Sequence, residues 1–177
     1  MIVAPVAFNQ ILFKAVAYKT SVESHGFRFC YQSGMLFIDL PSGRRHSYVK
    51  PRIETNRFGT DCVTYEGINL GKWTRLETYG PKVAENLVQV VSRDILAYAM
   101  KTLQHCFIVG SSHDELIIEC GPGVSLKAMC VQMGRTPPWI KGLLLKADGY
   151  ECRFYMKQRT VNCIKRDVYS CICNNDS

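Results

Sequence analysis

One long amphipathic segment, followed closely by two short apolar runs, constrains the fold of this chain more than any other feature. Apolar residues recur at helical spacing from Pro81 to Leu103, and Gly80 and Pro81 suit the start of a helix. The expected buried stripe consists of Ala84, Leu87, Val88, Val91, Ile95, Tyr98 and Leu103. The runs Phe107–Ser111 and Leu116–Cys120 then have the length and character of strands. The sequence therefore predicts a fold that mixes helices and strands.

Shorter elements are expected on both sides of this region. Apolar residues from Phe8 to Ser24 keep helical spacing, and Gly26 is the expected stop. Gly34 lies between two strand-like runs and predicts a β-hairpin. A shorter helix should begin after Ser125 and end at Gly134. The expected strands are residues 27–31, 35–40, 44–50, 62–66, 72–78 and 143–157, with a loop over 51–60 and a disordered tail over 158–177.

The composition narrows the class of protein. The chain has 177 residues, room for one ordinary domain, and carries 22 Lys and Arg against 15 Asp and Glu. A net charge of +7 favours polyanionic partners, nucleic acid first. The nine cysteines are irregularly spaced, mostly within apolar runs, and predict reduced buried thiols rather than disulfides or a zinc site. We find neither a signal peptide nor an apolar run long enough to span a membrane, so we expect a cytoplasmic protein.

A polar segment, Ser111 to Glu115, separates the two apolar runs, and a β-hairpin would place it at its tip. Carboxylates at the end of apolar strands cost stability unless a cation or donor meets them there. Because oxygen ligands suit Mg²⁺, we predict Asp114 as a metal ligand. Glu115 is the weaker contributor, since adjacent side chains on a strand point to opposite faces. An ordinary surface turn explains the same residues, whereas consecutive residues cannot form a hydrolase triad.

Two further groups of residues suit contacts with nucleic acid. Gln89 and Arg93 are four residues apart on the polar face of the long helix, and could reach one ligand together. Arg44 and Arg45 follow a Gly turn, with Lys50 and Arg52 close behind. Each pattern also fits an ordinary solvated surface.

Four segments, in order, resemble the C-terminal part of family A DNA polymerases, the polymerase I class, and above all the versions encoded by phages and prophages. Leu40–Tyr48 is similar to the Gly-Arg-Arg stretch after the nucleotide-binding helix. Glu77–Leu96 resembles the helix that carries a minor-groove-reading Gln. His113–Glu115 matches the third polymerase motif, a β-hairpin tip in the palm, and Pro137–Glu151 resembles the closing segment. The likeness covers roughly residues 8–157, the end of the fingers plus part of the palm.

The resemblance implies a fold and a set of roles. The fold is α+β, with an antiparallel palm-like sheet that carries a catalytic-type hairpin, backed by one long and one or two shorter helices. The chemistry is two-metal nucleotidyl transfer. By position, Asp114 and Glu115 would be catalytic, with Asp114 the ligand of Mg²⁺. The implied DNA-binding residues are His113 at the primer end, Gln89 in the minor groove, and Arg93, Arg44 and Arg45.

The chain also departs from the family. A second Asp motif, needed to hold both metals, and the nucleotide-binding helix with its R-x₃-K-x₆-[FY]-G pattern are absent. Ser112 replaces the apolar residue usual before His113, and the tail after Lys157 has no counterpart in the family. We therefore expect the chain to bind primer–template DNA but not to polymerise alone, and to use nucleoside triphosphates only if another chain supplies the missing motifs. A non-catalytic DNA-binding remnant, half of a split polymerase and a decayed gene product remain open alternatives.

Overall fold

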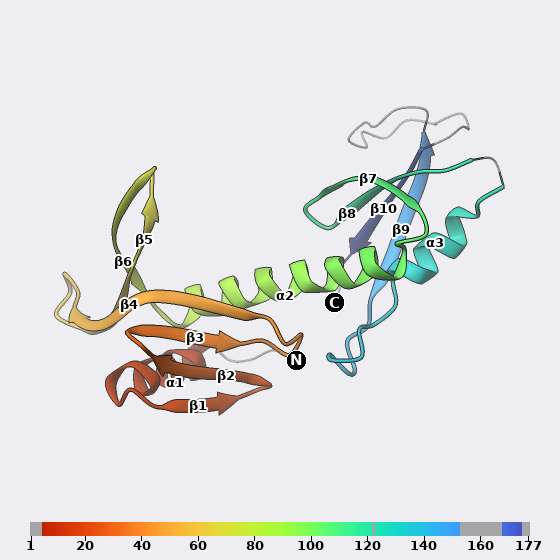
Figure 1. Cartoon of the computed structure of the whole chain (residues 1–177). Helices are drawn as coiled ribbons and strands as arrows, with labels where there is room; N and C mark the ends of the chain where they lie inside the picture. The colour runs from red at the N-terminus through yellow and green to blue at the C-terminus, as the bar shows by residue number, and fades with distance from the viewer. Residues whose placement is uncertain (1–4, 122, 153–167, 175–177) are drawn as a thin grey trace. The chain divides into compact units, whose positions relative to one another are not determined.

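The computed structural model describes residues 5–121, 123–152 and 168–174, which form helices and antiparallel sheets (Figure 1). This confirms the predicted α+β class. The described helices are α1 (Pro5–Ala17), α2 (Gly80–Thr102) and α3 (Leu126–Met133). Six strands make the first sheet in chain order: β1 (Ser21–Ser24), β2 (Phe27–Gln32), β3 (Met35–Asp39), β4 (Arg45–Thr55), β5 (Asp61–Asn69) and β6 (Lys72–Thr78). Four strands make the second, in the order β7 (Phe107–Ser112), β8 (Glu115–Glu119), β10 (Val168–Asn174) and β9 (Lys146–Cys152).

The chain divides into two compact units, Met1–Val91 and Ser92–Ser177. Each sheet belongs to one unit. The helix α2 crosses the boundary, and its two halves contribute to different cores. Val83 and Leu87 pack in the first unit, whereas Leu96, Ala99 and Leu103 pack in the second.

Three hairpins of the first unit turn on two residues, of which the second is always glycine. The turns are His25-Gly26, Ser33-Gly34 and Leu70-Gly71, and all six residues have positive φ. Two positive φ values in succession match the right-handed twist of the flanking strands, and glycine adopts them without strain. The local sequence thus fixes the register of these strand pairs.

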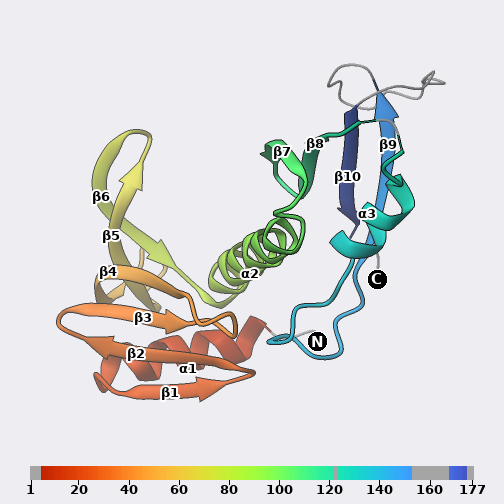
Figure 2. The same ribbon diagram turned by 45° about the vertical axis from the view of Figure 1, so that its right-hand side comes forward.

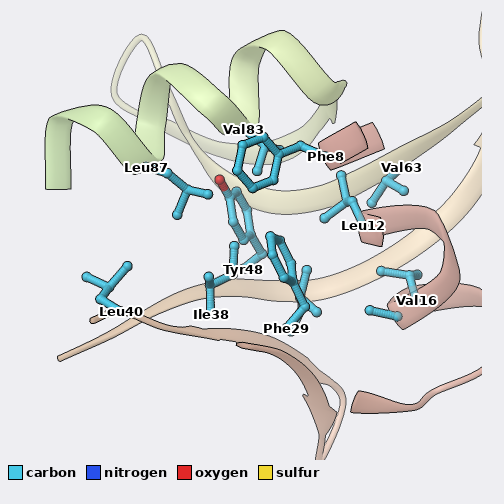
Figure 3. Close-up of a cluster of buried hydrophobic side chains, with 12 residues drawn as sticks. Phe8, Leu12, Val16, Phe29, Ile38, Leu40, Tyr48, Val63, Val83 and Leu87 are labelled. Carbon is cyan, nitrogen blue, oxygen red and sulfur yellow. The ribbon is translucent and has the colours of Figure 1, made fainter. Parts of the chain in front are cut away.

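The core of the first unit lies between α1, the sheet and the first half of α2 (Figures 1 and 2). Phe8, Leu12 and Val16 form one face of α1 and pack on Phe29 and its neighbours. In Figure 3 the ring of Tyr48 lies within this cluster, and its hydroxyl points toward α2. Burying such side chains is worth roughly 1.5–3 kcal/mol each, so this cluster holds the sheet against both helices.

The second unit has its own core, built from one face of the hairpin β7–β8, from α3 and from the second half of α2. Leu116 and Ile118 of β8 are fully buried, and they pack in one cluster with Met129 and Met133 of α3. Ser125 caps α3 as expected, because its side chain accepts a hydrogen bond from the backbone N–H of Ala128. The hairpin that carries the polar tripeptide is therefore anchored from one side.

The structure corrects several expectations about individual elements. The first helix ends at Ala17, and residues 21–24 form β1, because Gly26 belongs to a hairpin turn and does not stop a helix. The predicted loop over 51–60 is shorter, since β4 continues to Thr55 through an irregularity between Val49 and Arg52. Pro51 lies within that irregularity, where the sheet needs no N–H donor.

Other differences concern burial and the tail. Val88 was expected in the buried stripe of α2, but it is 64% exposed. Among the cysteines up to residue 152, Cys152 is buried as expected, whereas the other five, Cys30, Cys62, Cys106, Cys120 and Cys130, are only half-buried, and none of the six forms a disulfide. Within the expected disordered tail, residues 168–174 form β10; residues 158–167 and 175–177 lie outside the described part of the chain.

Candidate functional site

The hairpin β7–β8 places the predicted catalytic residues at its tip. The strands pair up to Ser112 and Glu115, so His113 and Asp114 alone form the turn. His113 and Asp114 are exposed and Glu115 is half-buried. The predicted position of the tripeptide on a hairpin tip is confirmed, while the roles of its residues stay predictions.

This turn differs in kind from the three glycine turns of the first unit. Its first residue, His113, has a φ of 53°, the same left-handed conformation that His25, Ser33 and Leu70 adopt in those turns. The difference lies at the second position, where Asp114 stands in place of glycine and has no positive φ. This tip therefore presents two exposed polar side chains, and exposed loop positions are where binding and catalytic side chains are concentrated. The turn is therefore the best candidate for chemistry in the second unit.

The hairpin tip does not by itself complete a metal centre. Asp114 and Glu115 supply two neighbouring carboxylates. Among the residues that the structure describes, no three His, Cys, Asp or Glu side chains are grouped so that they could hold one ion. Mg²⁺ accepts one or two protein carboxylates when water and phosphate complete its octahedron. These residues thus fit a partial site for one ion, and they do not fit a two-metal centre.

One further carboxylate shares the row of Glu115 on the sheet. Glu115 is paired with Ile172 of β10, which is paired with Asp148 of β9, so Glu115 and Asp148 face the same side of the sheet. Two strand spacings separate them, about 10 Å, which is too far to share one ion. Asp148 instead accepts from the Lys146 ammonium at 3.1 Å. Sequence reasoning missed this juxtaposition, because the register depends on β10.

In the first unit, the structure brings together two of the segments that resemble the polymerase family. The turn at Gly43, with a φ of 85°, directs Arg44 to α2, where its guanidinium donates to the backbone carbonyl of Val90 at 3.0 Å. Four residues further on, the hydroxyl of Tyr48 accepts from the Asn86 amide at 3.0 Å. The Arg44–Arg45 turn and the first half of α2 thus form one surface.

Neighbouring rings and charges set the electrostatics around this surface. The rings of His46 and Tyr65 both meet Tyr48 edge-on, with centroids 5.0 and 4.9 Å away. Burial raises the pKa of the Tyr48 hydroxyl, although the bond from Asn86 opposes this. Burial and the nearby Arg44 lower the pKa of His46, so this ring is neutral at neutral pH.

The predicted DNA-binding side chains differ in how strongly contacts within the chain hold them. Arg45 is tied to Asp39 by an ion pair of 2.5 Å, and its guanidinium lies 4.9 Å from the centroid of Phe37. Gln89 is exposed on α2 and donates weakly to Glu85 at 3.4 Å. Arg93 is exposed one turn later on the same helix. Gln89 and Arg93 can therefore turn to a ligand at small cost, whereas Arg45 would have to leave a carboxylate and a ring.

The chain is similar to a known DNA polymerase. It is 43% identical over 150 residues to a protein of Bacillus phage SP02 named "DNA polymerase". The match takes in 81% of this chain but only 23% of the phage protein, so the chain spans about a quarter of that relative. No profile of a known protein family matches the chain, and no solved structure is similar to it. In the described residues, no helix is long and apolar enough to cross a membrane.

Proposed function

We propose that this chain is the C-terminal, palm-bearing part of a family A DNA-directed DNA polymerase, that it binds primer–template DNA, and that it does not polymerise alone. The similarity to the phage polymerase supports a polymerase-related role. The observation that carries the assignment is the turn His113-Asp114, where a hairpin tip exposes a His and, in place of glycine, a carboxylate.

In this proposal, the exposed surface of α2 binds the duplex. The amide of Gln89 can both donate to and accept from base edges in the minor groove, where acceptors recur at every pair. Such contacts sense the shape of a pair rather than its identity. Arg93 and Arg44 contact phosphates, and the net charge of +7 favours this encounter.

Asp114 is the proposed ligand of Mg²⁺, Glu115 assists it and His113 contacts the primer end. The tip fits only a partial site, so the remaining carboxylate must come from elsewhere. A separate chain that carries the missing motifs could complete the centre, in which case nucleoside triphosphates become substrates. A cytoplasmic location follows from such a role in DNA replication.

Primer extension tests the proposal. The full chain with Mg²⁺, nucleotides and a primed template should give no product. We expect extension after addition of the SP02 polymerase from which the matched segment has been deleted. Asp114→Asn should abolish that activity, whereas Glu119→Gln, an exposed carboxylate at the other end of the same hairpin, should retain it. Extension by the chain alone would contradict the proposed dependence on a partner.

Binding of the duplex is tested separately by fluorescence anisotropy. Gln89→Ala and Arg93→Ala should each weaken primer–template binding severalfold, whereas Gln10→Ala, an exposed residue of α1, should not. Removing one phosphate contact with Arg93 should lower the salt slope by about one unit. If binding is salt-dependent and survives Asp114→Asn, but no complementing chain restores extension, the non-catalytic DNA-binding alternative is favoured instead.

A further inference from the structure

The loop that joins β4 to β5 presents an aromatic ring and a cation to solvent on a tightly bonded turn. Phe58 is 75% exposed, and the guanidinium of Arg57 lies 4.6 Å from the centroid of its ring. The turn connects two strands of the first sheet (Figure 1). Neither residue belongs to the described core of the first unit, so the packing of that core does not depend on this pair.

The turn holds its shape without help from the Phe58 side chain. The side-chain oxygen of Asn56 accepts the N–H groups of Phe58 and Thr60 at 2.9 and 3.0 Å. The backbone N–H of Asn56 donates to the carbonyl of Thr60 at 2.9 Å, and Gly59, with a φ of 77°, closes the reversal. A loop that is ordered in advance loses little conformational entropy when a ligand binds.

The charges around the turn leave Arg57 available. Of the two carboxylates nearest in sequence, Glu54 lies 3.7 Å from the Arg75 guanidinium, and Asp61 accepts from the Thr55 hydroxyl at 3.0 Å. In the part of the chain that the structure describes, Arg57 makes no ion pair. By contrast, the other exposed aromatic of this sheet, Trp73, donates to the Glu66 carboxylate at 3.2 Å. That carboxylate is also paired with Lys50 and Arg75, so the two cations near Trp73 are already engaged, whereas Arg57 beside Phe58 is not.

We infer that Arg57 and Phe58 form a binding site for single-stranded nucleic acid, in which a base stacks on the ring of Phe58 and Arg57 contacts a neighbouring phosphate. An open ring face with an adjacent cation is the arrangement with which proteins bind single strands without reading their sequence. The inference rests on the proposed function, and it adds contact with an unpaired strand to the binding of the duplex.

Abasic oligonucleotides separate stacking from charge attraction. The full chain should bind labelled (dT)₁₆ more tightly than an abasic strand of the same length. Phe58→Ala should weaken binding of (dT)₁₆ about tenfold and leave the abasic strand unchanged, since a tenfold loss lies within the range typical of one base stacked on an aromatic ring. Phe58→Tyr should retain binding of (dT)₁₆. Arg57→Gln should weaken binding of both strands and lower the salt slope.

The control is Tyr18→Ala, which removes another exposed ring of the first unit, 76% exposed and next to Lys19. It should change neither affinity. Equal affinity of wild type and Phe58→Ala for (dT)₁₆ would overturn the inference. If both proteins still bind primer–template duplex through Gln89 and Arg93, the proposed function stands despite that result. If wild type binds neither duplex nor single strand, both proposals fall.

Discussion

The hydrogen bond between Tyr48 and Asn86 links the strand that follows Arg44 to α2, and its removal should lower the free energy of unfolding of the first unit. Tyr48 is only 3% exposed, and its hydroxyl accepts from Asn86 at 3.0 Å, an ordinary N–H···O distance. Tyr48→Phe keeps the ring contacts and removes only the acceptor. A neutral hydrogen bond of this kind contributes about 1 kcal/mol net to the free energy of unfolding.

The assay is urea unfolding of the full chain. The sequence has two tryptophans, Trp73 in the first unit and Trp139 in the second. A Trp139→Phe background therefore leaves a fluorophore in the first unit alone. With a urea m-value of about 1–3 kcal/mol/M, a loss of ~1 kcal/mol lowers the midpoint by about 0.3–1 M.

A double-mutant cycle with Asn86→Ala isolates the pair from changes in helix propensity. We expect a coupling energy of about 1 kcal/mol. Tyr65→Phe is the matched control, because its ring packs on Tyr48 while its hydroxyl has no hydrogen-bond partner among the described residues. A coupling energy indistinguishable from zero, or an equal loss in Tyr65→Phe, would refute the role given to this bond.

Three further predictions concern the two units. The pKa of His46 in the folded chain lies below its ordinary value of 6.5, so the unfolded chain binds more protons between those two pH values. The free energy of unfolding of the first unit should therefore fall as the pH drops through 6.5. His46→Gln should flatten that pH dependence in urea titrations followed by the fluorescence of Trp73. Leu116→Ala should cost the second unit about 2–5 kcal/mol, since Leu116 is fully buried, and a loss below about 1 kcal/mol in thermal unfolding would contradict its place in the core. Gly134→Ala should destabilise the second unit by about 1–3 kcal/mol, because the new Cβ would lie 3.3 Å from the carbonyl of Cys130 and 3.4 Å from the N–H of Ala147. Gly121→Ala, where a Cβ would meet nothing within 4 Å, is its control and should show no comparable loss in the same melt.

Local signals predicted most elements of the fold. Gly34 marked one hairpin correctly, and the apolar stripe marked α2 to within one residue at each end. Those elements follow from backbone conformation and from burial on one face. β1 was not predicted, because residues 21–24 continue the helical spacing of α1 and only their pairing with β2 makes them a strand. β10 was not predicted either, because it too becomes a strand by pairing, and its partners β8 and β9 lie apart from it in the sequence.

The division into two units was hidden by the continuity of α2. Its apolar residues form one unbroken pattern in the sequence, but they pack into one core up to Leu87 and into another from Leu96 onward. Periodicity reports that a face is buried and not what buries it. The same limit explains Val88, which fits the helical spacing but is left exposed.

The position of the candidate site was predictable from the sequence, but the contacts that hold its side chains were not. Residue types and spacing located the hairpin tip at His113–Glu115 and placed cations near Gly43. They could not show that Asp39 and Phe37 hold Arg45, or that Arg44 caps a carbonyl of α2. These contacts depend on the register of β3 with β4 and on how the turn packs against the helix.

The ion pair of Arg45 changes which residues should control DNA affinity. To bind a phosphate, Arg45 must give up Asp39, and the gain is then only the difference between two charge contacts. An exposed residue such as Arg93 gives up only its hydrating water. The free energy that it gains from a phosphate contact is therefore not offset by the loss of an ion pair. Substitution of Arg93 should therefore weaken primer–template binding more than substitution of Arg45, although both carry the same charge. If Arg45→Gln has the larger effect on that affinity, then DNA displaces Asp39, and the surface near Gly43 is reshaped when DNA binds.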